Sequence, residues 1–496
     1  MLFKVSMMVM VVSLGMEIYK HKSRLKTNEK RKWFRGPSNG LSLPTLLPLL
    51  VLTSMVNGRL AVDCGYLVVL VRICLLFVVA SLVVLMAFAS KKTFRLDLGS
   101  ISILLVAAAF QLLQLSQLEC LLSLVVLYLV YYSIRVTFRR LLSLSESILI
   151  SIVASISLID SLLLVVSVLQ PTLMVVFSDD FKETVMTEMS SRNVVQVFFT
   201  ALVWGMILIG IVLMPLLKII RATSHLLHFG LSCLFLVLAS CIVVFGIRVF
   251  VLEAIGQDPF VWVLYLLFNA SHREPLYLAL YWIVFITLSV IVSSSWSPNN
   301  DSVSVNLRRK YFHFIAVAIF TPGYILDASF LHLSFSVAFS ALLLVEYVRL
   351  FKVLPSLNLD AFFCKFLNEK DQAEPLIVTH LFLLVGCAMP VWLYVSATDL
   401  GVGLSGVAAL GVGDAFASTV GKWIGTRFWP NNHKTVEGTA AFIISVFVFM
   451  TFVERNATYG VILVQCALTA LLEAFCDQND NLILPVYLFS LQLLMK

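Results

Sequence analysis

Uninterrupted apolar runs of roughly 18–25 residues recur along nearly the whole chain, and they limit its possible folds more than any other feature. The hydrocarbon core of a bilayer is about 30 Å thick, and a helix of about 20 apolar residues crosses it. A soluble core cannot bury so much apolar surface, because 60% of the 496 residues are hydrophobic and only 13% are charged. The sequence therefore predicts an all-α protein, a polytopic transmembrane helical bundle. A β-barrel is disfavoured, since its strands are short and alternate in polarity.

The apolar runs predict roughly 13–15 membrane segments. Residues 1–18 are expected to form an uncleaved first helix, because no small-residue cleavage site is evident and the basic stretch 20–36, placed in the cytosol, follows the apolar run. One further span opens at 308, and another helix ends near 350. The other segments are expected near 41–57, 66–89, 98–116, 119–134, 147–176 (one long or two short), 194–217, 226–252, 276–296, 375–396, 400–424, 438–454, 459–476 and 481–495.

The ionisable residues divide the chain into two regions. Residues 1–300 hold almost no ionisable side chain in the middle of a span, which predicts a scaffold or a lipid-facing surface. Residues 301–496 hold several, and we expect the functional site there. The net charge of +7 fits basic loops on the cytosolic side of a membrane better than nucleic-acid binding. The nine cysteines are dispersed without a CxxC pair, which argues against a disulfide framework or a zinc site.

A helix of small residues near 409–425 carries one aspartate, Asp414. A carboxylate at membrane depth costs about 2.5–3.5 kcal/mol unless it is paired or hydrated, so we expect Asp414 to face a polar cavity. The small residues recur at every fourth position and predict a face on which another helix packs closely. They are Ala409, Gly413, Ala417, Gly421 and Gly425.

A polar, basic loop follows this helix and leads into another apolar span. Lys434 and Thr435 lie just before that span, and Glu437 lies at its start. Backbone N–H groups at a helix start, a cation and hydroxyls together suit a polyphosphate. Glu437 adds a carboxylate that could hold a metal ion bridging the phosphates. The alternative interpretation is a solvated turn with a basic charge.

Further acids occur at or near membrane depth in the second region: Glu346, Glu473 and Asp480. Glu346 is a functional candidate by default, although an ion pair with Arg349 at i,i+3 would also explain it. The segment RRKYFHF contributes Arg309 and His313 as supporting residues, or as simple anchors at the membrane interface. Acids on several helices suit a magnesium–nucleotide site and suit an ion or proton pathway equally well. A transporter therefore remains the competing class, although no inverted repeat is evident.

Two common nucleotide-binding signatures do not identify a site in this sequence. The segment 401–406 matches G-x-G-x-x-G, but it has no βαβ context and indicates helix packing instead. The P-loop pattern G-x-x-x-x-G-K-[ST] is absent from the sequence.

Three segments together resemble the dolichol kinase family: GVGDAFASTVGKWIG, WPNNHKTVEGT and LLEAFCDQNDNLILPVYLF. RRKYFHF and LLLVEYVR are similar to the wider family of polyprenol, phytol and diacylglycerol kinases and CTP-dependent cytidylyltransferases. The resemblance covers about residues 305–490 and is weak or absent before them. It implies a catalytic membrane region at 301–496 that phosphorylates dolichol with CTP at the endoplasmic reticulum membrane and supplies the lipid carrier for protein glycosylation. Another lipid kinase or a cytidylyltransferase is the alternative enzyme.

The resemblance also implies roles for individual residues. The loop 421–439 is expected to bind CTP on the cytosolic face. Asp414, Glu437 and Asp480 are expected to be catalytic and to hold Mg²⁺, with Glu473 in a supporting role. His433 takes a position where the family more often has lysine. The nucleotide-binding residues implied are Lys422, Arg427, Asn431, Asn432, His433, Lys434, Thr435, Val436, Glu437, Gly438 and Thr439. The expected partners are dolichol or another polyprenol, CTP and the lipid bilayer, without nucleic acid.

Overall fold

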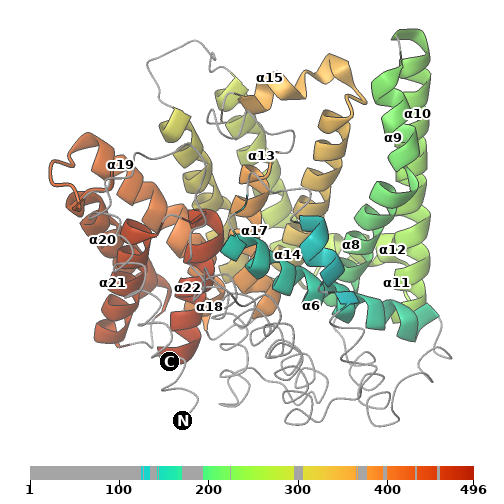
Figure 1. Cartoon of the computed structure of the whole chain (residues 1–496). Helices are drawn as coiled ribbons and strands as arrows, with labels where there is room; N and C mark the ends of the chain where they lie inside the picture. Colours follow the sequence, from blue (N-terminus) through green and yellow to red (C-terminus); the bar gives the residue numbers. More distant parts are fainter. Residues whose placement is uncertain are drawn as a thin grey trace, which may run out of the picture. The chain divides into compact units, whose positions relative to one another are not determined.

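The computed structural model describes helices and turns between residues 125 and 495, drawn as ribbons in Figure 1. Outside the described residues lie 1–124, 127, 135–141, 143, 170–193, 224, 295–304, 365, 367–376, 395–398, 431–432, 455–457, 477 and 496. The described elements are helical, with no β-strand among them, which confirms the predicted all-α fold. Several expected segments lie outside the described residues: the first helix, the three segments within 41–116 and the start of 119–134. The total of 13–15 segments therefore stays a prediction.

The chain divides into two compact units. The first unit holds Met1–Ser191, Phe428–Lys434 and Ala467–Lys496, and the second holds Arg192–Arg427 and Thr435–Cys466. The expected functional division near residue 300 stays a prediction.

The second unit begins with a series of apolar helices. They are α8 (Val194–Val212), α9 (Met214–Ala222), α10 (His225–Cys241), the π-helical turn η2 (Ile242–Gly246), α11 (Ile247–Ile255), α12 (Pro259–Phe268) and α13 (Glu274–Ser294). Helix α12 was not expected from the sequence. Asp258 caps it by accepting hydrogen bonds from the N–H groups of Phe260 and Val261, and Pro259 takes the first helical position, where an N–H is not needed.

Helix α14 (Val305–Leu350) has 46 residues, about twice the length that one membrane crossing needs. It breaks at Asp327, whose backbone is extended (φ −152°, ψ 94°). The Asp327 carboxylate accepts a hydrogen bond from the N–H of Phe330 at 2.8 Å and so caps the second half. The break therefore divides α14 into two membrane-length helices. Its far end shares a hydrophobic core with α8–α10 that includes Leu217, Phe235 and Val348.

The remaining elements of the second unit surround the polar stretch of the sequence. They are η3 (Pro355–Leu357), α15 (Leu359–Cys364), α17 (Thr379–Leu393), α18 (Leu400–Gly403), the π-helix η4 (Val407–Asp414), α19 (Ala415–Trp423), α20 (Val436–Val453) and the start of α21 (Tyr459–Phe475). A π-helix at 407–414 departs from the regular helical spacing that the sequence predicts, and such segments often occur at functional sites.

The predicted small-residue face packs closely against α20. A Cβ on Gly413 would lie 2.6 Å from the ring of Phe442, and one on Gly421 would lie 2.8 Å from Oγ1 of Thr435. The segment 401–406 likewise serves helix packing, since the ring of Tyr324 fills the space beside Gly403. Both predictions of close packing are confirmed.

Five helical runs among the described residues are long and apolar enough to cross a membrane: Val194–Val212, Leu227–Ile255, Glu274–Ser293, Arg308–Leu350 and Val436–Val453. Shorter apolar helices are α12, α17, α21 and α22 (Asp480–Met495). The first unit contains α22, the part of α21 from Ala467 onward, and α6 (Leu144–Leu169), which is a single helix over the described part of the expected segment 147–176.

Candidate functional site

Asp414 closes the π-helix η4, and its side chain is only 4% exposed. The ammonium of Lys310, from the first half of α14, forms an ion pair with this carboxylate and is itself 10% exposed. Gly411 allows the close approach of η4 to α14, because a Cβ there would lie 2.5 Å from Cγ2 of Val317. The polar cavity that the sequence predicts at Asp414 stays a prediction, and the structure shows an ion pair with Lys310 there.

His313 lies one turn beyond Lys310 on the same side of α14. Its Nδ1 is 2.9 Å from the carbonyl oxygen of Leu410 and 3.4 Å from the carboxylate of Asp414. The sequence selected His313 and Arg309 from the segment RRKYFHF and missed Lys310. The spacing of Lys310 and His313 at i,i+3 was the available signal, since it places both on one helix face.

The start of α20 is organised by its own side chains. Thr435 is the N-cap, and its hydroxyl accepts a hydrogen bond from the N–H of Gly438 at 3.1 Å. The carboxylate of Glu437 accepts hydrogen bonds from the hydroxyl of Thr426 at 2.9 Å and from the N–H of Arg427 at 3.0 Å. The N–H of Val436 donates to the carbonyl of Arg427 at 2.8 Å. These bonds hold the two ends of the loop, at Thr426–Arg427 and at Val436–Glu437, next to each other.

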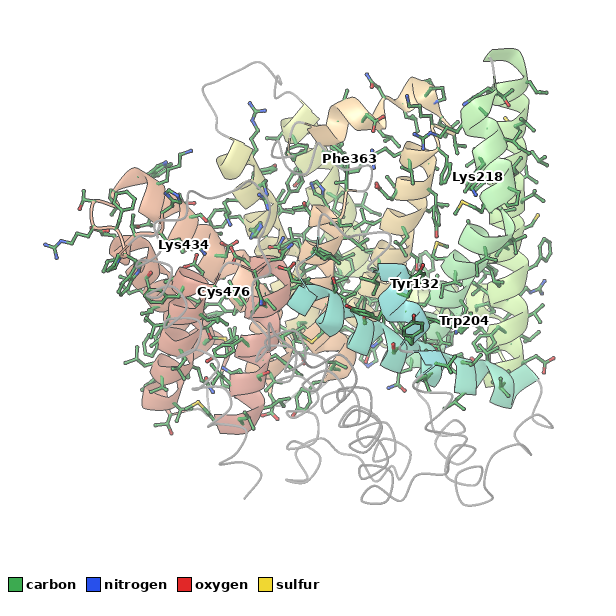
Figure 2. All side chains as sticks on the ribbon, viewed as in Figure 1. Tyr132, Trp204, Lys218, Phe363, Lys434 and Cys476 are labelled. Atoms are coloured by element: carbon green, nitrogen blue, oxygen red, sulfur yellow. The ribbon has the colours of Figure 1, made fainter. Side chains whose placement is uncertain are left out.

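Lys434 is held by acids of the first unit. Its ammonium donates to the carbonyl oxygen of Glu473 at 2.6 Å and to the Glu473 carboxylate at 2.5 Å, and it lies 3.6 Å from the carboxylate of Asp480. The ring of Trp429 packs 5.1 Å from that of Phe475. Figure 2 shows Lys434 beside the end of α21, where Cys476 is labelled. The side chains of Lys434 and Asp480 remain about one-third exposed, so a ligand can reach them.

The turn before α22 is fixed by a residue that the sequence did not single out. Glu146, fully buried in the first turn of α6, accepts a hydrogen bond from the N–H of Asn479 at 2.5 Å. The Asn479 side chain in turn accepts from the N–H of Asn481 at 3.1 Å. The available signal was an acid at the start of an apolar run in a region otherwise poor in ionisable residues.

Glu346 belongs to a separate ion-pair network. Its carboxylate accepts from the guanidinium of Arg349 at 2.6 Å and from the N–H of Ile377 at 2.9 Å, and Arg349 also pairs with Asp360 at 2.8 Å. The i,i+3 ion pair proposed from the sequence is therefore confirmed. The network joins the end of α14 to α15 and to the segment before α17.

The other predicted residues are distributed around the loop. Lys422, Arg427, His433 and Val436 are exposed, whereas Gly438 and Thr439 are buried. Asn431 and Asn432 lie outside the described residues. Asp414 and Glu437 belong to the second unit, and Glu473 and Asp480 belong to the first. Their expected joint role in holding a metal ion stays a prediction.

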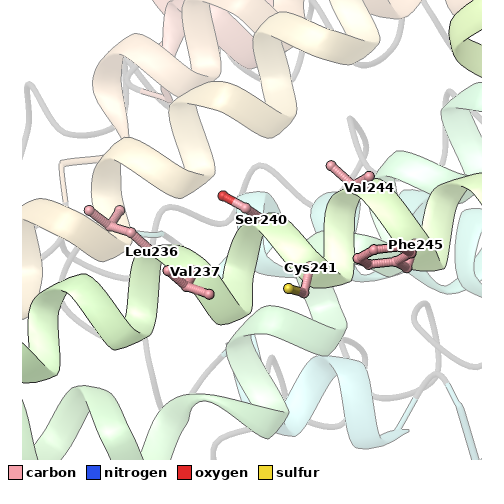
Figure 3. Close-up of a pocket in the computed structure, with 6 residues that line it drawn as sticks. All are labelled: Leu236, Val237, Ser240, Cys241, Val244 and Phe245. Atoms are coloured by element: carbon pink, nitrogen blue, oxygen red, sulfur yellow. The ribbon is translucent and has the colours of Figure 1, made fainter.

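A hollow of about 370 Å³ occurs on the surface of α10 and η2 (Figure 3). It is lined by Leu236, Val237, Ser240, Cys241, Val244 and Phe245, all on one continuous helical run. It contains no ionisable carboxylate, amine or guanidinium and offers little chemistry for a polar substrate.

The fold and the polar clusters define an integral membrane protein with buried ion pairs and a basic loop of phosphate-binding composition. A family model described as dolichol kinase matches residues 125–387, just over half of the chain. The chain therefore belongs to the dolichol kinase family. This match begins well before residue 305, so the expectation of a weak or absent resemblance there was wrong.

Several relatives support the same family. Human dolichol kinase is 35% identical over 328 residues, which cover 61% of this chain and 59% of the human protein. Dolichol kinase sec59 of Schizosaccharomyces pombe is 32% identical over 314 residues, 58% of this chain and 61% of the relative. Dolichol kinase EVAN of Arabidopsis thaliana is 36% identical over 249 residues, 48% of this chain and 43% of the relative. The chain thus spans less than two thirds of the length of these relatives. No solved structure matches it.

Proposed function

We propose that this protein is a CTP-dependent dolichol kinase. It transfers the γ-phosphate of CTP to the terminal hydroxyl of dolichol at the endoplasmic reticulum membrane, and the dolichyl phosphate serves as a lipid carrier for protein glycosylation. Family membership supports the kinase activity and the lipid substrate. The choice of CTP rests on the resemblance of the 421–439 loop.

The observation that carries the proposal is the position of Lys434. Its ammonium is partly exposed on the loop and is oriented by Glu473 and Asp480. It immediately precedes Thr435, the N-cap of a membrane-length helix. A helix start with an adjacent, oriented cation suits the phosphates of a nucleotide.

The proposed reaction is a direct transfer. The dolichol oxygen forms a bond to the γ-phosphorus, the bond from that phosphorus to the β–γ bridging oxygen breaks, and CDP leaves. As the oxygen attacks, the hydroxyl proton passes to a carboxylate, either Asp414 or Asp480, directly or through a side chain that accepts the hydrogen bond of the hydroxyl. Catalysis of this kind is mainly positioning and neutralisation of charge, which Lys434 with Arg427 or Lys422 would supply to the phosphates.

Mg²⁺ or another divalent cation is the proposed cofactor. The available donors are carboxylate oxygens, which Mg²⁺ prefers. Asp480 and Glu473 already lie within reach of a single cation, the ammonium of Lys434. Asp414 and Glu437 are the other proposed ligands. When bound, the ion would neutralise charge on the phosphates.

The charges at the two ends of the second unit support a cytosolic nucleotide site. The basic run 308–310 lies at the start of α14, and Arg427 precedes α20. Acids mark the opposite ends: Asp327 at the break in α14 and Glu454 just after α20. Because cytosolic loops carry an excess of Lys and Arg, we place the loop in the cytosol.

The test is an assay of purified protein in detergent with dolichol, Mg²⁺ and CTP labelled in the γ-phosphate. Movement of the label into the lipid supports the kinase. In a parallel reaction with a lipid phosphate as the acceptor, release of labelled pyrophosphate would instead indicate a cytidylyltransferase. No turnover, together with ion flux in vesicles, would contradict both enzymes and favour a transporter. Replacement of CTP by ATP tests the choice of nucleotide.

A further inference from the structure

We propose that Nε2 of His313 accepts a hydrogen bond from the hydroxyl of the isoprenoid alcohol and so orients the attacking oxygen. This inference rests on the proposed function and identifies how the same site recognises its acceptor. It assigns a substrate contact to a side chain that the sequence suggested only as a supporting residue.

The hydrogen bonds of the imidazole fix its tautomer. Nδ1 lies 2.9 Å from the carbonyl oxygen of Leu410, and a carbonyl oxygen can only accept. Nδ1 therefore carries the hydrogen, and the carboxylate of Asp414, 3.4 Å away, favours the same arrangement. In the neutral ring Nε2 is then left with a lone pair, directed away from Leu410.

Nε2 has no hydrogen-bond partner among the residues that the structure describes. The side chain of His313 is only 5% exposed, so bulk water has little access to it. A bound ligand can supply the hydrogen bond that Nε2 would otherwise lack. The lone pair can accept a hydrogen bond from a donor. Phosphate oxygens are acceptors, whereas the hydroxyl of an alcohol can donate, so the geometry selects the alcohol over the nucleotide phosphates.

The place of His313 in the membrane suits the end of a long apolar alcohol. It follows Arg308 by five residues, about 7.5 Å along the helix axis from the basic end of the span. The next residue, Phe314, is 38% exposed and packs edge-on against Phe416, which is 41% exposed. Apolar surface for an isoprenoid chain therefore begins one residue from the polar group.

Two substitutions separate the nitrogens of the ring. In His313→Asn the amide reaches the position of Nδ1 and can keep the bond to Leu410, but nothing occupies the position of Nε2. In His313→Gln the amide reaches the position of Nε2. We expect His313→Asn to keep its melting temperature and its KM for CTP while kcat/KM for dolichol falls about 100-fold. His313→Gln should lose less than about tenfold.

His332 is the matched control. It is a buried histidine on the second half of α14, 5% exposed, with its ring edge-on to Phe199. His332→Asn should change the kinetics for dolichol and for CTP equally or not at all. If His313→Asn keeps full activity toward dolichol, or raises KM for CTP instead, the proposed contact is wrong.

A binding measurement tests the hydrogen bond between His313 and the alcohol even if phosphate transfer is not observed. Purified protein is titrated with a polyprenol and with its O-methyl ether, which cannot donate a hydrogen bond. We expect the wild type to bind the alcohol about tenfold more tightly than the ether. His313→Asn should bind the two equally. An unchanged preference in His313→Asn would overturn the inference, whereas absence of transfer by the wild type would overturn only the proposed function.

Discussion

Lys310 and Asp414, 104 residues apart in the chain, form an ion pair in which both side chains are at least 90% buried. Two charges removed from water are tolerated only when they remain together, because a single uncompensated charge in a low-dielectric interior is costly. The pair therefore joins α14 to the π-helix η4. Asp414 is the aspartate that the sequence places at membrane depth in the small-residue helix near 409–425.

Loss of either partner should destabilise the protein strongly. We expect Lys310→Met and Asp414→Asn each to cost about 3–5 kcal/mol of unfolding free energy and to abolish phosphate transfer. The double variant should lose much less stability than the sum of the two, because it leaves no unpaired charge. Thermal unfolding in detergent measures this coupling. Additive losses would show that the two side chains do not interact in the membrane.

Lys434 should be required for turnover beyond its contribution to stability. Its side chain is 31% exposed, but its removal takes a cation away from the Glu473 carboxylate, which is only 7% exposed, so some loss of stability is expected beside the loss of activity. We expect Lys434→Ala to lower kcat/KM for CTP at least about 100-fold, because a preorganised cation next to the phosphates is lost. Lys218→Ala, on the exposed face of α9, is the control and should have no effect. Equal kinetics of the two variants would remove Lys434 from the nucleotide site.

The contact between α19 and α20 should not accept a methyl group. A Cβ on Gly438 would lie 2.8 Å from the carbonyl oxygen of Ala417, which is backbone and cannot move aside cheaply. We expect Gly438→Ala to cost about 1–3 kcal/mol. A methyl group added to Gly460, near the start of α21, would meet nothing within 4 Å, so Gly460→Ala should be neutral or slightly stabilising. Equal melting temperatures for the two variants would contradict the described packing.

The network around Glu346 should affect stability and not catalysis. The Glu346 carboxylate is shared between Arg349 and the N–H of Ile377. We expect Glu346→Gln and Arg349→Met to lower the unfolding temperature, with strong coupling in the double variant. The specific activity of the folded fraction should be unchanged. A selective loss of kcat in Glu346→Gln at an unchanged melting temperature would restore Glu346 as a functional residue.

Much of the fold follows from hydrophobicity and spacing. The spans from 194 to 296 and from 438 to 495 are close to helices in the structure, because the length of an apolar run is set by the bilayer and needs no tertiary information. Helix α12 was missed, since ten residues between polar turns are too few for a span. Its cap, Asp258 followed by Pro259, was the local signal that could have found it.

The candidate site was predictable in part. Asp414 was found because an isolated acid in a small-residue helix is costly, and the loop before α20 because its composition suits phosphate. The partners of these residues were not found, because helical spacing from His313 marks Arg309 as well as it marks Lys310. Only the way in which α14 packs against η4 places Lys310 beside Asp414.

The sequence by itself therefore determined the class of the protein, the places of most of the apolar helices that the structure describes and the presence of acids that need partners, because hydrophobic periodicity and the cost of a buried charge are local properties. The tertiary structure alone decided the partners of Asp414 and Glu473. Lys310 faces Asp414 and Lys434 faces Glu473, whereas the pair of Glu346 with Arg349 already followed from their i,i+3 spacing on one helix. The physical reason is that an ion pair depends on how two helices are rotated and shifted against each other, and that is fixed by packing over many residues far apart in the chain.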